Sequence, residues 1–239
     1  MKYMGSKNRI AKHLLPIILK DRKPNQWYVE PFVGGANMID KVTGNRIGSD
    51  SNKYLIALLQ KLKTNWEPER FITANIYSDV MKNKDEYEDY FVGYVGFLFS
   101  FGAKFFGGFV GEFNPGKNKR DRIGESYRNA IKTRKQVSGV KLITSSYSEL
   151  DIPDCSIIYC DPPYANTTKY KDDFDHDEFW QWCRDKAKEG HQVFISEYNA
   201  PDDFICVWQQ ELNVSVAKNG KHKKAIEKLF VHKSQFKGE

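Results

Sequence analysis

Short apolar runs that stop at glycines or acidic residues recur in the first and last parts of the chain. A run without polar alternation is typical of a strand buried on both faces of a parallel sheet. Apolar positions at the three- and four-residue spacing of helices separate these runs. The first expected strand starts at Trp27, and further strands are expected at 46–49, 140–144, 156–160, 192–196 and 204–208. The first expected helix starts at Ser6, and further helices are expected at 53–63, 125–137 and 175–189. The pattern predicts an α/β fold with a mostly parallel sheet.

The end of the chain predicts an antiparallel addition to this sheet. The segments 212–217 and 227–231 are expected strands on either side of a lysine-rich loop around Asn219-Gly220. Asn-Gly is a preferred turn of β-hairpins, so we expect these two strands to pair with each other.

The character of the sequence changes between residues 66 and 139. Aromatic and apolar residues with helical spacing are followed by glycines, phenylalanines and Lys104, and then by a basic run over 115–122. Cations contact phosphates and aromatic rings stack on bases, so this mixture favours a nucleic-acid surface, although the rings alone also fit a small core. We predict a mostly helical insertion over 66–139 in a domain formed by 1–65 and 140–239.

The most informative stretch is Asp161-Pro162-Pro163-Tyr164, which ends the apolar run at 156–160. Proline cannot continue a strand ladder, and it keeps the preceding residue out of the helical region. The turn should therefore be extended and stiff at the carboxyl end of a strand, where open α/β sheets bind ligands. The Asp161 carboxylate, the Pro162 carbonyl and the Tyr164 ring offer two acceptors and a stacking face. That set suits the amino group of a planar base, while a simple strand end with a capping acid is the alternative.

Other expected strand ends carry residues that suit a nucleotide ligand. Gly34-Gly35 lets a ligand approach the backbone, although the full GxGxxG pattern is missing. Asp50 ends the second strand, where an acid binds ribose hydroxyls, or else caps the next helix. The turn at Gly5-Ser6 offers bare N–H groups to a carboxylate, and Lys7 adds positive charge. Tyr147 and 196–198 follow two later strands.

Net charge and cysteines narrow the class of protein. The net charge of +6 is uneven: 115–135 and 217–237 each hold an excess of six positive charges, and the remainder sums to −6. Two basic islands on an acidic body indicate a polyanionic partner, with solvated lysine-rich loops as the alternative.

The cysteines Cys155, Cys160, Cys183 and Cys206 lack CxxC spacing, so we expect reduced core residues and no metal site. No apolar run reaches membrane-spanning length and no apolar signal region begins the chain, which predicts a cytoplasmic protein.

Taken in order, these motifs resemble the Dam-type DNA adenine-N6 methyltransferases of the α group, the D12 class, in a phage or mobile-element version. The resemblance implies a Rossmann-like methyltransferase sheet with a target-recognition insertion, and S-adenosyl-L-methionine as the methyl donor. It implies catalytic roles for Asp161, Pro162 and Tyr164. It implies cofactor contacts for Tyr3, Met4, Gly5, Lys7, Pro31, Phe32, Gly34, Gly35, Asp50, Tyr147 and Asp161. Ser146 stands where the family usually has an acid that contacts the cofactor adenine.

The implied reaction is methyl transfer to N6 of an adenine flipped out of duplex DNA, with GATC as a family-level recognition site. Lys104, Lys117, Lys119, Arg120 and Arg122 are the expected DNA contacts. No membrane or metal partner is expected, and the protein should be a monomer or weak dimer. Two alternatives remain open: methylation of cytosine N4 or RNA, and a catalytically silent DNA-binding member. A cytosine-C5 enzyme would need a Pro-Cys nucleophile, which Cys160-Asp161 does not provide.

Overall fold

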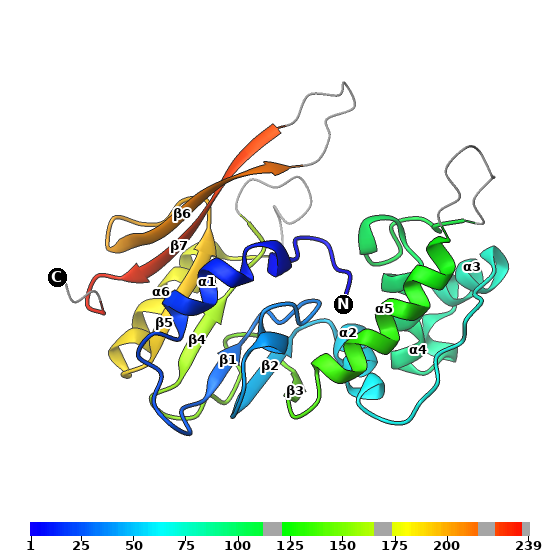
Figure 1. Cartoon of the computed structure of the whole chain (residues 1–239), viewed down its shortest axis with the longest axis horizontal. Coiled ribbons are helices and arrows are strands. Elements are labelled where there is room, and N and C mark those ends of the chain that lie inside the picture. Colours follow the sequence, from blue (N-terminus) through cyan, green and yellow to red (C-terminus); the bar gives the residue numbers. More distant parts are fainter. Residues whose placement is uncertain (112–120, 165–173, 215–222, 236–239) are drawn as a thin grey trace.

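The computed structural model describes residues 1–111, 121–164, 174–214 and 223–235 (Figure 1). Seven strands form one sheet in the order β3-β2-β1-β4-β5-β7-β6. Their bounds are Tyr28–Glu30 for β1, Arg46–Asp50 for β2, Lys141–Thr144 for β3, Ile157–Cys160 for β4, Gln192–Glu197 for β5, Phe204–Val214 for β6 and Lys223–His232 for β7. The first five strands are parallel, and β7 is antiparallel to both β5 and β6. The strand order reverses direction between β1 and β4, which is the switch point of a Rossmann-like sheet. The predicted fold class is confirmed.

One expectation about the last strands is wrong. The segments 204–208 and 212–217 were expected to be separate strands, but β6 runs without a break from Phe204 to Val214. Its ladder with β7 shifts register between Cys206 and Trp208, as at a β-bulge. Because β6 is an edge strand, polar residues in its middle do not interrupt it. The antiparallel pairing with 227–231 is confirmed, and the Asn219-Gly220 loop lies outside the described residues.

Helices cover both faces of the sheet, because residues of each inner strand alternate between two apolar clusters. Ile157 and Tyr159 of β4 join the cluster that contains α1 (Ala11–Ile18) and α2 (Lys53–Leu62). Ile158 and Cys160 join the cluster of α6 (His176–Lys188) on the other face. These helices lie where the sequence predicts them, with one shift at the start. Ser6 caps a short 3₁₀ helix at Lys7–Arg9, and α1 begins only at Ala11.

The segment 66–139 is mostly helical, as expected, and lies to one side of the sheet (Figure 1). It holds α3 (Ala74–Lys82), α4 (Asp89–Gly93), a π-helical turn at Tyr94–Leu98 and α5 (Arg122–Gln136). The remaining 3₁₀ turns of the described chain are Ile39–Lys41, Lys84–Glu86 and Phe101–Ala103. The aromatic pattern around 85–101 therefore forms several short helical pieces.

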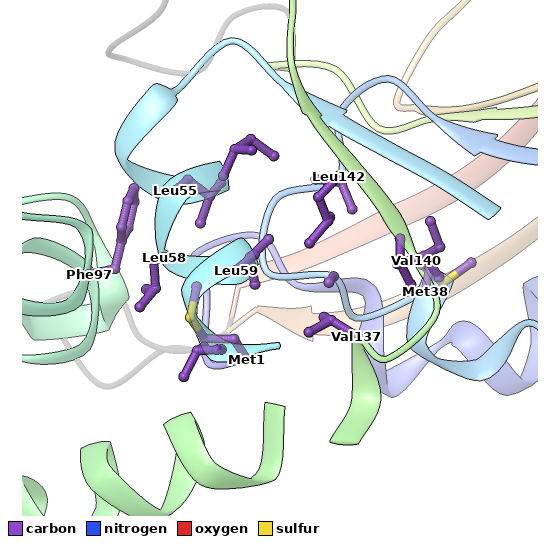
Figure 2. Close-up of a cluster of buried hydrophobic side chains, with 14 of the residues drawn as sticks. Met1, Met38, Leu55, Leu58, Leu59, Phe97, Val137, Val140 and Leu142 are labelled. Atoms are coloured by element: carbon purple, nitrogen blue, oxygen red, sulfur yellow. The ribbon is translucent and has the colours of Figure 1, made fainter. Parts of the chain in front are cut away.

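A shared core joins these helices to the sheet. Leu58 of α2, Phe97 of the π-helical turn and Val140 before β3 belong to one buried cluster, which Figure 2 shows around α2. The cluster continues into Ala130 of α5 and Leu14 of α1. The helical segment is thus packed on α2 through apolar side chains. The division into a catalytic domain and a recognition insertion stays a prediction.

The expectation for the cysteines holds in part. Cys160 and Cys183 are buried, but Cys155 and Cys206 are exposed. Cys155 lies in the turn before β4 at a φ of 54°, and Cys206 lies at the irregular point of the edge strand β6. Among the described residues no group of His, Cys, Asp and Glu has the arrangement of a metal site. The described helices include none with the length and apolar character of a membrane span.

We expect Gly93→Ala to lower the free energy of unfolding by about 1–3 kcal/mol or more, because α4 packs backbone to backbone on α2. A Cβ on Gly93 would lie 2.1 Å from the Tyr54 carbonyl oxygen. Gly96→Ala is the comparison: its Cβ would meet the Phe105 ring at 2.5 Å, and a ring moves more easily than a helix backbone. Urea unfolding should show the larger loss for Gly93→Ala. Equal urea midpoints for Gly93→Ala and the parent protein would contradict the close packing of α4 on the α2 backbone.

Candidate active site

Asp161 lies directly after β4, at the carboxyl edge of the sheet. Side chains alternate between the two faces along a strand, so the Asp161 carboxylate points to the same face as Ile157 and Tyr159. This is the face covered by the N-terminal segment. Its side chain is 22% exposed. Burial raises the pKa of Asp161, and the cation of Lys7 opposes that rise. The carboxylate therefore depends on a neighbouring cation to stay ionised.

Lys7 supplies that cation. Its side chain is 8% exposed, and its ammonium lies 3.2 Å from Asp161 Oδ1 and 3.2 Å from Glu227 Oε2. It also donates a hydrogen bond to the Tyr164 hydroxyl. Burial opposes the charged form, but the two carboxylates outweigh it and raise the pKa of Lys7. The expected cofactor contact of Lys7 stays a prediction, and its ammonium faces Asp161, Tyr164 and Glu227.

Glu227 is a site residue that sequence reasoning missed. It lies in the middle of β7, and Lys228 beside it pairs with Glu197 at the end of β5. Because β7 is antiparallel to β5, this pairing puts Glu227 at the sheet edge where β5 ends. Glu227 was counted only as an acid within a basic island. Its position at this edge could have been inferred only from the strand order.

Tyr164 completes this cluster. Its hydroxyl donates to Glu227 Oε2 at 2.8 Å, and its ring lies edge-on to Tyr198 with 4.6 Å between centroids. The Lys7 ammonium is 4.4 Å from the centroid of the Tyr164 ring. Burial raises the pKa of Tyr164 well above its usual value, so the phenol stays protonated and can donate. Pro162, which follows Asp161, is buried. The four residues Lys7, Asp161, Tyr164 and Glu227 are called the Lys7 cluster below.

A second group forms around the glycine turn after β1. Gly34 adopts a φ of 47°, and its N–H donates to Asp50 Oδ2 at 3.2 Å. Tyr3 packs over the turn so closely that a Cβ on Gly35 would lie 2.5 Å from the Tyr3 Cβ. Three expected cofactor elements, namely the N-terminal motif, the glycine turn and the acid after β2, are thus brought together.

Asp50 is held by backbone groups. Its Oδ1 accepts a hydrogen bond from Asn52 N–H at 3.0 Å, in addition to the Gly34 contact. Burial raises the pKa of Asp50, and these two hydrogen bonds oppose the rise. The cap of α2 is a different residue, since Asn52 Oδ1 accepts from Leu55 N–H at 3.1 Å. Asp50 is therefore not needed as the helix cap.

An aromatic group lies beside the glycine turn on the α6 face. Phe32 stacks on Tyr147 with centroids 5.4 Å apart, and Trp182 meets Tyr147 edge-on at 5.3 Å. The buried Trp182 Nε1–H has no acceptor in the part of the chain that the structure describes. Ser146 hydrogen-bonds within its own turn, to Glu149 Oε2 at 3.0 Å. Two other expected cofactor residues, Met4 and Gly5, are exposed, and Gly5 adopts a φ of 78°.

Only part of the expected DNA surface is described. Lys117, Lys119 and Arg120 lie outside the described residues. The Arg122 guanidinium lies 5.1 Å from the centroid of the exposed Phe101 ring, and the backbone N–H of Lys104 donates to the Phe101 carbonyl at 3.3 Å. The Lys104 backbone and the Arg122 guanidinium thus both contact Phe101.

Two surface hollows lie away from the Lys7 cluster. The first, of about 340 Å³, is lined by Arg70, Phe71, Asp121, Gly124, Tyr127 and Arg128. The second, of about 310 Å³, is lined by residues of the N-terminal segment, by Asn37 and by residues of α5, with Lys2, Arg9 and Lys132 as its charged members. Both combine cations with aromatic or neutral polar groups, which is typical of surfaces that contact nucleic acid.

Comparison with known proteins gives a family match. The model of the family described as D12 class N6 adenine-specific DNA methyltransferase matches residues 3–133, which is more than half of the chain. The matched part includes the glycine turn and Asp50 but ends before the Asp161 turn. A solved "putative methyltransferase from Thermoplasma acidophilum" shares 10% sequence identity, with a TM-score of 0.35 over 91% of this chain and 73% of that one. No curated protein matches the chain.

Proposed function

The chain belongs to the family of D12 class N6 adenine-specific DNA methyltransferases, and from this premise we propose that it methylates N6 of a flipped adenine in duplex DNA. The observation that carries the proposal is the Lys7 cluster, which puts the Asp161 carboxyl group, paired with a buried cation, and a phenol ring at the carboxyl edge of the sheet. Family membership supports methyl transfer from S-adenosylmethionine. The roles of individual residues and the flipped base are our proposal.

The residues around the glycine turn fit S-adenosylmethionine. The absence of a Cβ at Gly34 and Gly35 lets Tyr3 lie directly on the turn, Asp50 offers carboxylate oxygens to ribose hydroxyls, and the Trp182 N–H suits a ring nitrogen of the adenine. When bound, S-adenosylmethionine supplies a methyl group on a cationic sulfur. We assign its binding to Tyr3, Met4, Gly5, Pro31, Phe32, Gly34, Gly35, Asp50, Tyr147 and Asp161, and we place Lys7 with the catalytic turn.

The catalytic turn would act on the target base in three ways. Tyr164 stacks on the flipped adenine, while Asp161 and the Pro162 carbonyl accept the two hydrogens of its amino group. Both hydrogen bonds draw the amino lone pair out of conjugation and direct it toward the methyl donor. Holding the reacting atoms in this way can contribute about 7–11 kcal/mol to lowering the barrier. The Lys7 cation favours the ionised form of Asp161, which accepts a hydrogen bond.

DNA would be held by the helical segment. The hollow between Arg70 and Arg128 and the pair of Arg122 with Phe101 offer guanidinium groups beside exposed rings. Guanidinium groups contact phosphates, and rings stack on bases. The basic hollow between the N-terminal segment and α5 would extend this surface toward the sheet.

The test is labelled methyl transfer from S-adenosylmethionine to mixed-sequence duplex DNA, followed by mass spectrometry of the nucleosides. We expect 6-methyladenine in DNA. Finding 4-methylcytosine alone, or label only in an added ribosomal RNA, would overturn the choice of target, and no label in any nucleic acid would indicate a silent binding protein. Single-molecule sequencing of the product then reports the recognition site, with GATC as the family-level expectation.

Charge reversal of the basic run tests the DNA surface. We expect replacement of Lys117, Lys119, Arg120 and Arg122 by glutamate to weaken DNA binding and to flatten its dependence on salt, because fewer counterions are released. The matched control reverses the exposed Lys12, Lys20, Lys23 and Lys233, with the same change in net charge. Fluorescence anisotropy over a salt series measures both. An unchanged salt slope for the first variant would show that the run is only solvated surface.

A further inference from the structure

We propose that Glu227 is a positioning residue of the active site, which holds the Tyr164 ring through its hydroxyl and fixes the Lys7 ammonium that faces Asp161. This inference rests on the proposed function of the Asp161 turn and adds a residue from the last strand to it. It also assigns a role to the hydroxyl of Tyr164, which stacking on a base does not require.

The geometry gives Glu227 two partners in the cluster through one oxygen. Glu227 Oε2 accepts from the Tyr164 hydroxyl at 2.8 Å and lies 3.2 Å from the Lys7 ammonium. Its side chain is 13% exposed, and that of Lys7 is 8% exposed. A carboxylate so little exposed is stabilised by charged and hydrogen-bonded partners, and its removal leaves them unpaired. Glu227 thus connects three parts of the chain: the N-terminal 3₁₀ turn, the turn after β4 and the middle of β7.

Besides Lys7, which donates to its hydroxyl and lies 4.4 Å from its ring centroid, Tyr164 has two further contacts that constrain it. Tyr198 lies against it edge-on at 4.6 Å, and Glu227 holds its hydroxyl. An edge contact leaves the ring free to slide, whereas a directed hydrogen bond fixes where the hydroxyl lies. Together they set the plane on which a base would stack. A displacement of about 1 Å in such a positioning group can cost about 100-fold in rate.

Glu227 also affects the charge on Asp161. Burial raises the pKa of Asp161, Lys7 opposes the rise, Glu227 adds to it, and a hydrogen bond from Tyr164 opposes it. The other titratable groups that face Asp161 are Glu30 at the end of β1, Tyr159 within β4 and Tyr198 after β5. Removing the charge of Glu227 should therefore lower the pKa of Asp161, while removing its hydrogen bond should disturb Tyr164.

Three variants separate the two effects. Glu227→Ala removes both the charge and the acceptor, Glu227→Gln keeps an acceptor oxygen, and Tyr164→Phe keeps the ring but removes its hydroxyl. On the pH plateau, where Asp161 is ionised, we expect Glu227→Ala and Tyr164→Phe to lower kcat by about 10- to 100-fold. Glu227→Gln should retain most of kcat and move the acid limb of the pH profile to lower pH. Ile226→Ala, at the exposed neighbour on the same strand, should match the parent protein.

The double variant Glu227→Ala/Tyr164→Phe tests whether the two residues act as one unit. Its kcat should be no lower than that of the poorer single variant, because both changes break the same contact. The same cycle followed by urea unfolding, without cofactor or DNA, should give losses in midpoint that do not add. Losses that add in both measurements, or full activity of Tyr164→Phe, would overturn the inference. If the parent protein methylates no nucleic acid, the proposed function fails, while the unfolding cycle still decides whether Glu227 and Tyr164 are linked.

Discussion

Asp161→Ala should reduce methyl transfer by about 100- to 1,000-fold, the loss typical when a preorganised contact to the reacting group is removed. The carboxylate is proposed to accept one hydrogen of the amino group, and alanine has no acceptor. Lys7 keeps Glu227 as a partner in this variant, 3.2 Å away, so its charge is not left alone. Single-turnover transfer to duplex DNA measures the chemical step directly.

The matched control for this prediction is Asp151→Ala. Asp151 is exposed near the other end of β4, so the same chemical change should leave the rate unchanged. Circular dichroism of both variants checks that the sheet is intact. A folded Asp161→Ala protein with substantial turnover would remove Asp161 from the mechanism.

Lys7→Met should have the second large effect, on stability as well as on activity. It leaves Asp161 and Glu227 side by side without their cation, and breaking a buried ion pair by removing one partner costs about 3–5 kcal/mol. The loss of the cation should also raise the pKa of Asp161 further and move the acid limb of the activity profile to higher pH. This shift is opposite in sign to the one expected for Glu227→Gln.

The pH dependence of stability gives a further check on Lys7. In the parent protein the pKa of Lys7 is raised above 10.5, so its contribution is complete at neutral pH and is lost only as pH rises through the raised value. In Lys7→Met the destabilisation should be largest at neutral pH, where both carboxylates are ionised. It should shrink as pH falls through the raised pKa of Asp161, because a protonated carboxyl needs no cation. Urea unfolding at several pH values measures this, with Lys12→Met as the exposed control; a loss independent of pH would contradict the role of the charge.

The sheet could be predicted from the sequence because its inner strands are buried on both faces and read as uninterrupted apolar runs. The run 156–160, for example, matches β4 at Ile157–Cys160 to within one residue. The edge strand β6 could not be delimited in this way. One of its faces meets solvent, so Gln209 and Gln210 belong to the strand although they resemble a loop.

The candidate site was predictable where a single turn carries the chemistry, as at Asp161 and at Gly34-Gly35. It was not predictable where the contact joins distant parts of the chain. Lys7 and Glu227 are 3.2 Å apart in space but lie near opposite ends of the sequence. No local pattern links them, because their meeting depends on β7 entering the sheet beside β5 in the antiparallel direction.

The apolar cluster around α2 limits how this protein can diversify. Leu55, Leu58 and Leu59 of α2 contribute to the same core as Phe97 and Val137, so the helical segment has no separate interior of its own. Replacing 66–139 by the corresponding segment of a relative would disturb the packing between this segment and α2 and would expose α2 to water. Chimeras should therefore be insoluble unless α2 is exchanged together with the segment, and new target preferences would arise more readily through surface loops than through shuffling of whole modules.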